Sequence, residues 1–97
     1  MSTMYNDKKV VVIMPAYNAE MTLRRTFDEV VAQEVVDLVI IVDDCSVDET
    51  TSIARDLPGA VLFIHDYNQG YGGNQKTCYR LALENGADIV IMVHPDY

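Results

Sequence analysis

Ile40-Ile-Val-Asp-Asp-Cys-Ser-Val-Asp-Glu-Thr50 is the stretch that decides the fold of this chain. Its apolar, β-branched half reads as a strand, and it stops abruptly at two neighbouring carboxylates, Asp43 and Asp44. A parallel strand that delivers acids at its carboxyl end places them in the ligand crevice of an open α/β sheet. Because adjacent carboxylates repel each other and lose hydration on burial, we interpret the pair as groups that meet a ligand.

Three further apolar runs share the character of this strand. They are nearly continuous rather than alternating, which is typical of parallel strands buried on both faces. The four expected strands are Val10–Met14, Leu38–Val42, Val61–Ile64 and Ile89–Val93. Helical segments fill the gaps, so the sequence predicts the order β-α-β-α-β-α-β. That order is typical of a Rossmann-like α/β sandwich of three layers around a mainly parallel sheet.

The first helix is expected at about Ala19–Gln33, because apolar side chains recur there at helical spacing. Its expected buried face consists of Leu23, Phe27, Val30 and Val31.

The second and third helices carry recognisable end signals. Ser46-Val-Asp-Glu49 fits a capping box, in which Ser46 accepts the backbone N–H of Glu49 and Glu49 reaches back. The third helix is expected to follow Gly70-Tyr-Gly-Gly73 and to end at Asn85-Gly86, a suitable left-handed cap.

Composition narrows the classes of function. Seven Lys and Arg residues against fifteen Asp and Glu residues give a formal net charge of −8. This argues against a nucleic-acid backbone or an anionic membrane surface as partner. No apolar run approaches the length of a membrane span, and the first residues are too polar for a signal peptide. Cys45 and Cys78 lack metal-ligand spacing, so reduced thiols in a cytoplasmic protein are expected.

Each expected strand is followed by residues whose side chains can bind a ligand. After the first, Pro15 stiffens the turn, Tyr17 offers a ring that can stack on a base, and Asn18 can cap the next helix. After the second, Asp43 and Asp44 can accept hydrogen bonds from a nucleobase or a ribose hydroxyl. For each of these residues, ordinary turn, packing or capping roles remain the alternative.

The residues after the third and fourth strands indicate a ligand site less strongly. The glycines before the third helix allow a ligand to approach the backbone, and Lys76 can face a diphosphate; a solvated lysine beside a plain turn is the alternative. His94 and Asp96, two residues apart, can ligate one divalent cation, although such a pair more often stays without metal.

Together these blocks resemble family 2 glycosyltransferases of the GT-A fold. Val11-Val-Ile-Met-Pro-Ala-Tyr-Asn18 is similar to that family's first strand and nucleotide-binding turn. Ile40–Thr50 matches its VVDDGSxDxT block, with Cys45 where glycine is usual. Asn68-Gln-Gly-Tyr-Gly-Gly73 resembles its N-x-G-x-G segment, and Asp88–Val93 resembles its fourth strand.

The resemblance implies roles for individual residues. The nucleobase would be cradled by residues 15–17 and read by Asp44, with Asp43 structural or facing the ribose. The metal motif would fall at His94-Pro-Asp96, where histidine replaces the first acid, so that Asp96 is the safer ligand for Mg²⁺ or Mn²⁺. The implied nucleotide-binding set is Pro15, Ala16, Tyr17, Asn18, Glu20, Asp43, Asp44, Gly70 and Lys76, and the implied metal set is Asp96 and His94.

The resemblance also implies an activity, namely transfer of a sugar from a nucleotide-diphosphate donor to a glycan or polyprenyl-phosphate acceptor. The chain ends at His94-Pro-Asp-Tyr97, directly after a strand. We therefore expect residues 1–97 to be the amino-terminal, donor-binding part of a larger glycosyltransferase domain, with little turnover alone. The catalytic base is expected beyond residue 97. Cytoplasmic localisation is expected, with any membrane association arising outside these residues.

Three other classes of protein share features with this sequence. A response-regulator receiver domain also presents paired acids, but after its first strand, and Asp66 would have to be its phospho-acceptor. A binding-only module of the same fold draws support from His94. A nucleotidyltransferase would need a basic glycine-rich loop where this chain has Pro15-Ala-Tyr-Asn18. The donor base, the sugar, the stereochemical outcome and the oligomeric state are left open by the sequence.

Overall fold

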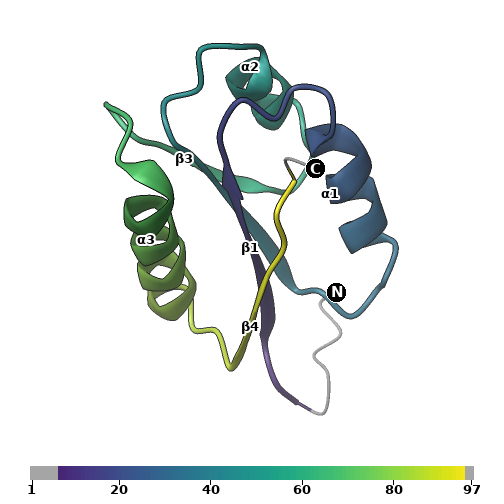
Figure 1. The fold of residues 1–97 in the computed structure, drawn as a ribbon. Helices are drawn as coiled ribbons and strands as arrows, with labels where there is room; N and C mark the ends of the chain where they lie inside the picture. Colours follow the sequence, from purple (N-terminus) through teal and green to yellow (C-terminus); the bar gives the residue numbers. More distant parts are fainter. Residues whose placement is uncertain (1–6, 96–97) are drawn as a thin grey trace.

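The computed structural model describes residues 7–95, and Figure 1 shows their arrangement. Strands and helices alternate along the chain as the sequence predicts. In chain order the elements are β1 (Val10–Ala16), α1 (Leu23–Val31), β2 (Leu38–Asp43), α2 (Thr50–Arg55), β3 (Val61–Ile64), α3 (Gly70–Glu84) and β4 (Ile89–Met92).

The four strands form one sheet in the order β3-β2-β1-β4, and every neighbouring pair is parallel. β1 lies between β2 and β4, with Ile13 paired to Ile40 on one side and to Met92 on the other. The chain therefore moves outward from β1 through β2 to β3 and then returns to the far side of β1. In open α/β sheets, ligands bind at the strand carboxyl ends where the order reverses in this way.

The sheet separates two apolar cores, which confirms the three-layer prediction. α1 and α2 cover one face and α3 covers the other (Figure 1). Val12, Met14 and Ile41 point to the first face, and Val11 and Ile13 to the second. Alternate residues of one strand are thus buried on both sides, which explains the continuous apolar runs.

Helix α1 is shorter than predicted and buries a narrower stripe. Leu23, Phe27 and Val30 are buried, as expected from their spacing. The prediction for Val31 was wrong: its side chain is 49% exposed at the last position of the helix. A residue next to the stripe is buried only where a neighbouring element covers it, and about half of Val31 is left uncovered.

The predicted capping box before α2 is also absent. The helix begins at Thr50, and Glu49 makes no side-chain cap hydrogen bond. Ser46 instead donates both its backbone N–H and its hydroxyl to Asp43. Asp48 accepts the N–H of Thr50 at 2.9 Å, so that the turn before the helix is closed by a carboxylate two residues upstream.

Helix α3 starts at Gly70, so the glycines form its first turn instead of preceding it. Gly70 has φ +79°, a backbone conformation that strains residues with a Cβ. A Cβ on Gly73 would come within 2.8 Å of the Gln69 Cβ, whereas one on Gly72 would meet nothing. The helix ends at Asn85-Gly86 with Gly86 at φ +77°, which confirms the predicted cap.

The two cysteines differ in burial, and this makes a prediction about reactivity. Cys78 is buried in the α3-side core, and burial raises the pKa of its thiol to about 12. Cys45 is partly exposed, and both thiols are free. Because the thiolate is the reactive form, we expect a thiol reagent at pH 8 to modify Cys45 in the native chain and Cys78 only after unfolding. Mass spectrometry of labelled peptides tests this, and native labelling of Cys78 at the rate of Cys45 would contradict it.

None of the helices within residues 7–95 is long and apolar enough to cross a membrane.

Candidate functional site

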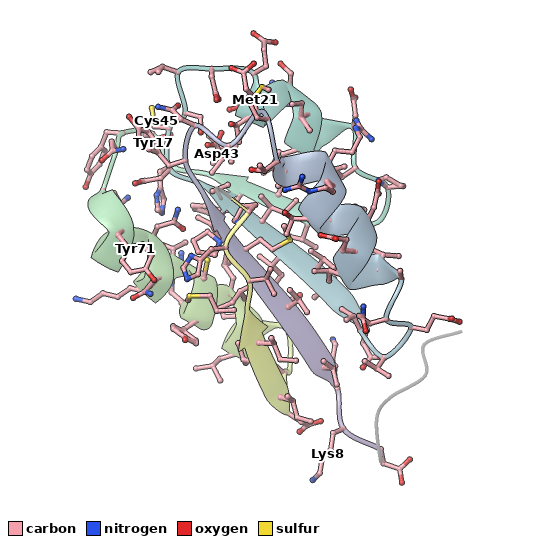
Figure 2. All side chains as sticks on the ribbon, turned by 45° about the vertical axis from the view of Figure 1, so that its right-hand side comes forward. Lys8, Tyr17, Met21, Asp43, Cys45 and Tyr71 are labelled. Atoms are coloured by element: carbon pink, nitrogen blue, oxygen red, sulfur yellow. The ribbon has the colours of Figure 1, made fainter. Side chains whose placement is uncertain are left out.

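A cavity of about 290 Å³ opens at the carboxyl ends of the strands. Its walls come from the ends of β1 and β2, the segment before α3, the first turns of α3 and the segment after β4. Figure 2 shows Tyr17 and Tyr71 on the side of the molecule where this cavity lies. The lining residues are Pro15, Ala16, Tyr17, Asp44, Asn68, Gly70, Tyr71, Asn74 and His94.

Asp44 is the charged group of this wall, and it is almost completely buried. Its Oδ1 accepts the backbone N–H of Gln69 at 2.8 Å and lies 2.8 Å from Nδ1 of His65. Its Oδ2 accepts the N–H of Gly70 at 3.0 Å. The carboxylate therefore holds the amino-terminal end of α3 against the end of β2, while remaining part of the cavity wall.

Asp43 has a different role, although it is the neighbour of Asp44. It is fully buried, and its carboxylate accepts hydrogen bonds from Ser46 and from the Thr51 hydroxyl. It does not line the cavity. The two carboxylates thus avoid each other by binding different segments, Asp43 the start of α2 and Asp44 the start of α3.

The turn after β1 is tied to the turn after β2. Asn18 donates its N–H to the Ser46 hydroxyl at 3.0 Å and accepts the N–H of Val47 at 2.9 Å. Asn18 therefore fastens two loops together and does not cap α1, contrary to the prediction. Its φ of +50° is one that asparagine tolerates better than most residues.

Asp48 completes this connection. It accepts the backbone N–H of Glu20 at 3.2 Å and two hydrogen bonds from Thr50. Burial acts to raise the pKa of Asp48, but these hydrogen bonds outweigh it and hold the pKa below its ordinary value. The carboxylate is therefore ionised at neutral pH, and it fixes the turn that carries Tyr17 to the cavity.

Aromatic side chains provide much of the remaining wall. Tyr17 is 41% exposed, so a large part of its ring is available to a ligand. Tyr71 stacks on His94 with ring centroids 5.4 Å apart, and its hydroxyl lies 3.1 Å from Nε2 of His94. This contact joins the first turn of α3 to the segment after β4. Stacked and edge-exposed rings of this kind are suited to a planar heterocycle.

Comparison with known proteins gives this geometry a context. Residues 11–97 match the sequence family Glycosyl transferase family 2. The chain belongs to this family. It is 30% identical, over 93% of its length, to UDP-N-acetylglucosamine–dolichyl-phosphate N-acetylglucosaminyltransferase of Methanococcus voltae. It is 31% identical, over 78% of its length, to 4,4'-diaponeurosporenoate glycosyltransferase of Staphylococcus aureus.

Solved glycosyltransferase structures share the fold. The chain superposes on residues 1–349 of S. aureus TarS in complex with UDP with a TM-score of 0.76 and 25% identity, over 91% of this chain and 27% of that one. For glucosyl-3-phosphoglycerate synthase of Mycobacterium tuberculosis in complex with UDP, the TM-score is 0.74 at 24% identity, over 95% of this chain and 35% of that one. The GT-A fold is thereby confirmed.

This family 2 chain spans less than half the length of the relatives that it matches. The matched segment makes up 42% of the M. voltae enzyme and 20% of the S. aureus carotenoid glycosyltransferase. The sheet order also separates the chain from the receiver-domain alternative, in which the first strand lies between the second and the third.

The structure gathers only some of the residues that the family resemblance indicated. Pro15, Ala16, Tyr17, Asp44, Gly70 and His94 line the cavity. Asn18, Glu20, Asp43 and Lys76 do not. Asn18 and Asp43 have the structural contacts given above, and the side chains of Glu20 and Lys76 are exposed. Asp96 lies outside the described residues.

Four site residues were missed by sequence reasoning. Asn68, Tyr71 and Asn74 line the cavity, and His65 supports Asp44 from behind. Tyr71 carried a detectable signal, because an aromatic residue inside a glycine-rich segment at a strand end is unusual as packing. Asn74 carried less: it is buried, and its amide donates to the carbonyl of Val42 at 3.1 Å, a contact that only the fold reveals.

A metal ion fits only part of this arrangement. Residues 7–95 contain no group of three or more His, Cys, Asp or Glu side chains that could hold one. His94 brings an imidazole to the cavity, but Mg²⁺ and Mn²⁺ prefer oxygen ligands. The residues that the structure describes therefore do not hold such a cation by themselves.

Proposed function

We propose that this chain is the donor-binding part of a glycosyltransferase that uses a uridine-diphosphate sugar. The observation that carries the proposal is the cavity at the reversal of strand order, with a buried carboxylate and an exposed aromatic ring in its wall. Support for uridine also comes from similar chains solved with UDP, those of TarS and glucosyl-3-phosphoglycerate synthase.

The hydrogen bonds of Asp44 favour uracil over guanine. A carboxylate has about four acceptor positions, and His65, Gln69 and Gly70 already use three of those of Asp44. A single position is left, on Oδ2. Uracil presents one N–H donor on its pairing edge, whereas guanine presents two that call for both carboxylate oxygens. Asp44 is therefore matched to one donor, with Tyr17 available to stack on the ring.

The diphosphate would leave the cavity past the first turns of α3. Helix amino termini favour anions, and the exposed Lys76 lies on the second turn of this helix. A divalent cation, held by Asp96 with His94 and phosphate oxygens, would supply further positive charge to the leaving group. Glucosyl-3-phosphoglycerate synthase has been solved with Mn²⁺ and UDP.

In the reaction that we propose for the whole protein, an acceptor oxygen forms a bond to the anomeric carbon. The bond from that carbon to the diphosphate oxygen breaks, and its electron pair leaves with the nucleoside diphosphate. The residues of this chain bind and orient the donor. A base from outside residues 1–97 takes the proton of a hydroxyl acceptor, whereas a phosphate acceptor attacks as its anion. We propose that the acceptor is a glycan or a polyprenyl phosphate; the M. voltae relative is named for dolichyl phosphate. We also propose that the protein is cytoplasmic.

A thermal-shift titration tests donor binding directly. We expect UDP to raise the melting temperature, and GDP, CDP and ADP to raise it little. Saturation at a hundredfold over Kd adds about 2.7 kcal/mol, which corresponds to about 10 °C or more for a domain of this size. Each nucleotide is tested with and without Mn²⁺. No shift with UDP, or a larger shift with GDP, would contradict the proposal.

A binding-only module is the second candidate, and the observation that favours it is His94. Its Nε2 faces the Tyr71 hydroxyl at 3.1 Å, where the metal motif of the family would place an acid. UDP binding that is unchanged by Mn²⁺, together with absent sugar transfer in the longest available form of the protein, would favour this candidate over the transferase.

A further inference from the structure

His65 is a buried titratable residue to which neither the sequence nor the family resemblance gives a role. It directly follows β3, and its side chain is 3% exposed. Nδ1 lies 2.8 Å from Oδ1 of Asp44, and Nε2 lies 2.8 Å from the hydroxyl oxygen of Thr77 on α3. The ring of Phe63 meets it edge-on, with centroids 5.8 Å apart. The imidazole therefore bridges the cavity carboxylate and the helix that forms the opposite wall.

The direction of each hydrogen bond follows from the partners. An ionised carboxylate only accepts, so Nδ1 carries a hydrogen and donates it to Asp44. The Thr77 hydroxyl has one hydrogen, which it gives either to the Gly73 carbonyl oxygen at 3.2 Å or to Nε2. In the first arrangement the ring is an imidazolium, and in the second it is neutral. The bond from Nδ1 to Asp44 is the same in both.

This bond limits the orientation of the Asp44 carboxylate. Oδ1 is held by His65 and by the N–H of Gln69, which leaves the free acceptor position on Oδ2. Without the imidazole, Oδ1 keeps one hydrogen-bond partner, the N–H of Gln69, and the carboxylate can turn about its last torsion, which is broad for aspartate. A ligand N–H would then meet an acceptor that is no longer fixed before binding.

We propose that His65 is a positioning residue for donor recognition: it holds the Asp44 carboxylate in the orientation that presents Oδ2 to the nucleobase. This inference rests on the proposed donor-binding function. It goes beyond that function because His65 does not line the cavity and contacts the ligand only through Asp44. Thr77 contacts the other ring nitrogen and so supports the far end of the imidazole.

Substitutions at His65 separate positioning from simple packing. His65→Asn keeps a donor close to the position of Nδ1 and loses the contact with Thr77. His65→Leu keeps a similar volume and loses both contacts. By isothermal titration calorimetry with UDP, we expect His65→Leu to weaken binding by about 10- to 100-fold, the range for a buried hydrogen bond to a charged group. His65→Asn is expected to remain within about threefold of the wild-type chain.

A spectroscopic measurement tests the same bond without a ligand. Long-range ¹H–¹⁵N correlation spectra of the imidazole should show Nδ1 of His65 carrying its hydrogen from pH 6 to pH 8. We expect this signature to remain in Thr77→Val and to change in Asp44→Asn. This measurement does not use His65→Leu, so it tests the bond even if that variant does not fold. Circular dichroism would reveal such a failure to fold.

The outcomes distinguish this inference from the proposed function. Absence of UDP binding by the wild-type chain would overturn the proposed function and this inference with it. UDP binding that is equally tight in the wild-type chain and in folded His65→Leu would overturn the positioning role alone. An unprotonated Nδ1 at neutral pH would overturn it as well.

Discussion

Replacing Asp44 by asparagine is expected to weaken UDP binding by about 100-fold, or about 2.7 kcal/mol. The amide can offer its oxygen to only some of the donors that the carboxylate now accepts from His65, Gln69 and Gly70. Its NH₂ group then faces a ligand N–H or a backbone N–H, and either contact is repulsive. Calorimetric titration with UDP at about 15 °C measures the effect while the variant remains folded.

Asp66→Asn is the matched control for this experiment. Asp66 lies two residues beyond β3, and its side chain is exposed, so the same change of one charge leaves the cavity wall intact. We expect its affinity for UDP to remain within about twofold of the wild-type value, because exposed charges contribute little. Equal losses in the two variants would show that net charge, and not the carboxylate in the cavity, governs binding.

The largest effect on stability is expected from Leu23→Ala. Leu23 is completely buried at the first position of α1, in the core beneath β1. Removing most of its side chain eliminates apolar contacts and leaves a cavity, which costs about 2–5 kcal/mol. Total stabilities of domains are about 5–15 kcal/mol, so the variant is expected to be close to unfolding. Urea denaturation followed by circular dichroism measures the change.

Val31→Ala, on the same helix, provides the control. Half of the Val31 side chain is already in water, and alanine has the higher helix propensity. We expect a change below about 0.5 kcal/mol. A loss similar to that of Leu23→Ala would mean that Val31 belongs to the core, as its spacing alone indicated.

The sheet could be predicted from the sequence because its strands are buried on both faces. Each residue of Val10–Ala16 is buried, so the apolar run carries the strand signal without interruption. The width of the buried face of each helix was harder to predict. Spacing gives the direction of the apolar stripe but not its width, which depends on the neighbouring elements. Val31 was assigned to the core for this reason.

The predicted start of the second helix was wrong for a different physical reason. Ser46 has the correct spacing from Glu49 for a capping box, but local patterns do not reveal competing partners. Asp43 is three residues upstream, ionisable and fully buried, and it binds Ser46 instead. A buried carboxylate needs donors more than an exposed helix end does, so the tertiary contact replaced the local one.

Part of the candidate site followed from one rule, that parallel strands present their next residues at a common edge. Tyr17, Asp44 and His94 come together in this way. Lys76 and Glu20 do not, because their positions depend on the rotation of a helix and the path of a turn. The contact of His65 with Thr77 joins a strand end to a helix twelve residues later. No periodic pattern in the sequence records such a pair.

The glycines in the first turn of α3 differ in how readily the fold would tolerate their replacement during evolution. At Gly73 a side chain would collide with Gln69, and at Gly70 it would require a strained backbone. The fold therefore disfavours substitution at both positions, whatever ligand the protein binds. Gly72 is under no such constraint from the fold. A homologous protein could therefore carry a larger residue at position 72 and still fold, and glycine retained there would need a cause other than the fold.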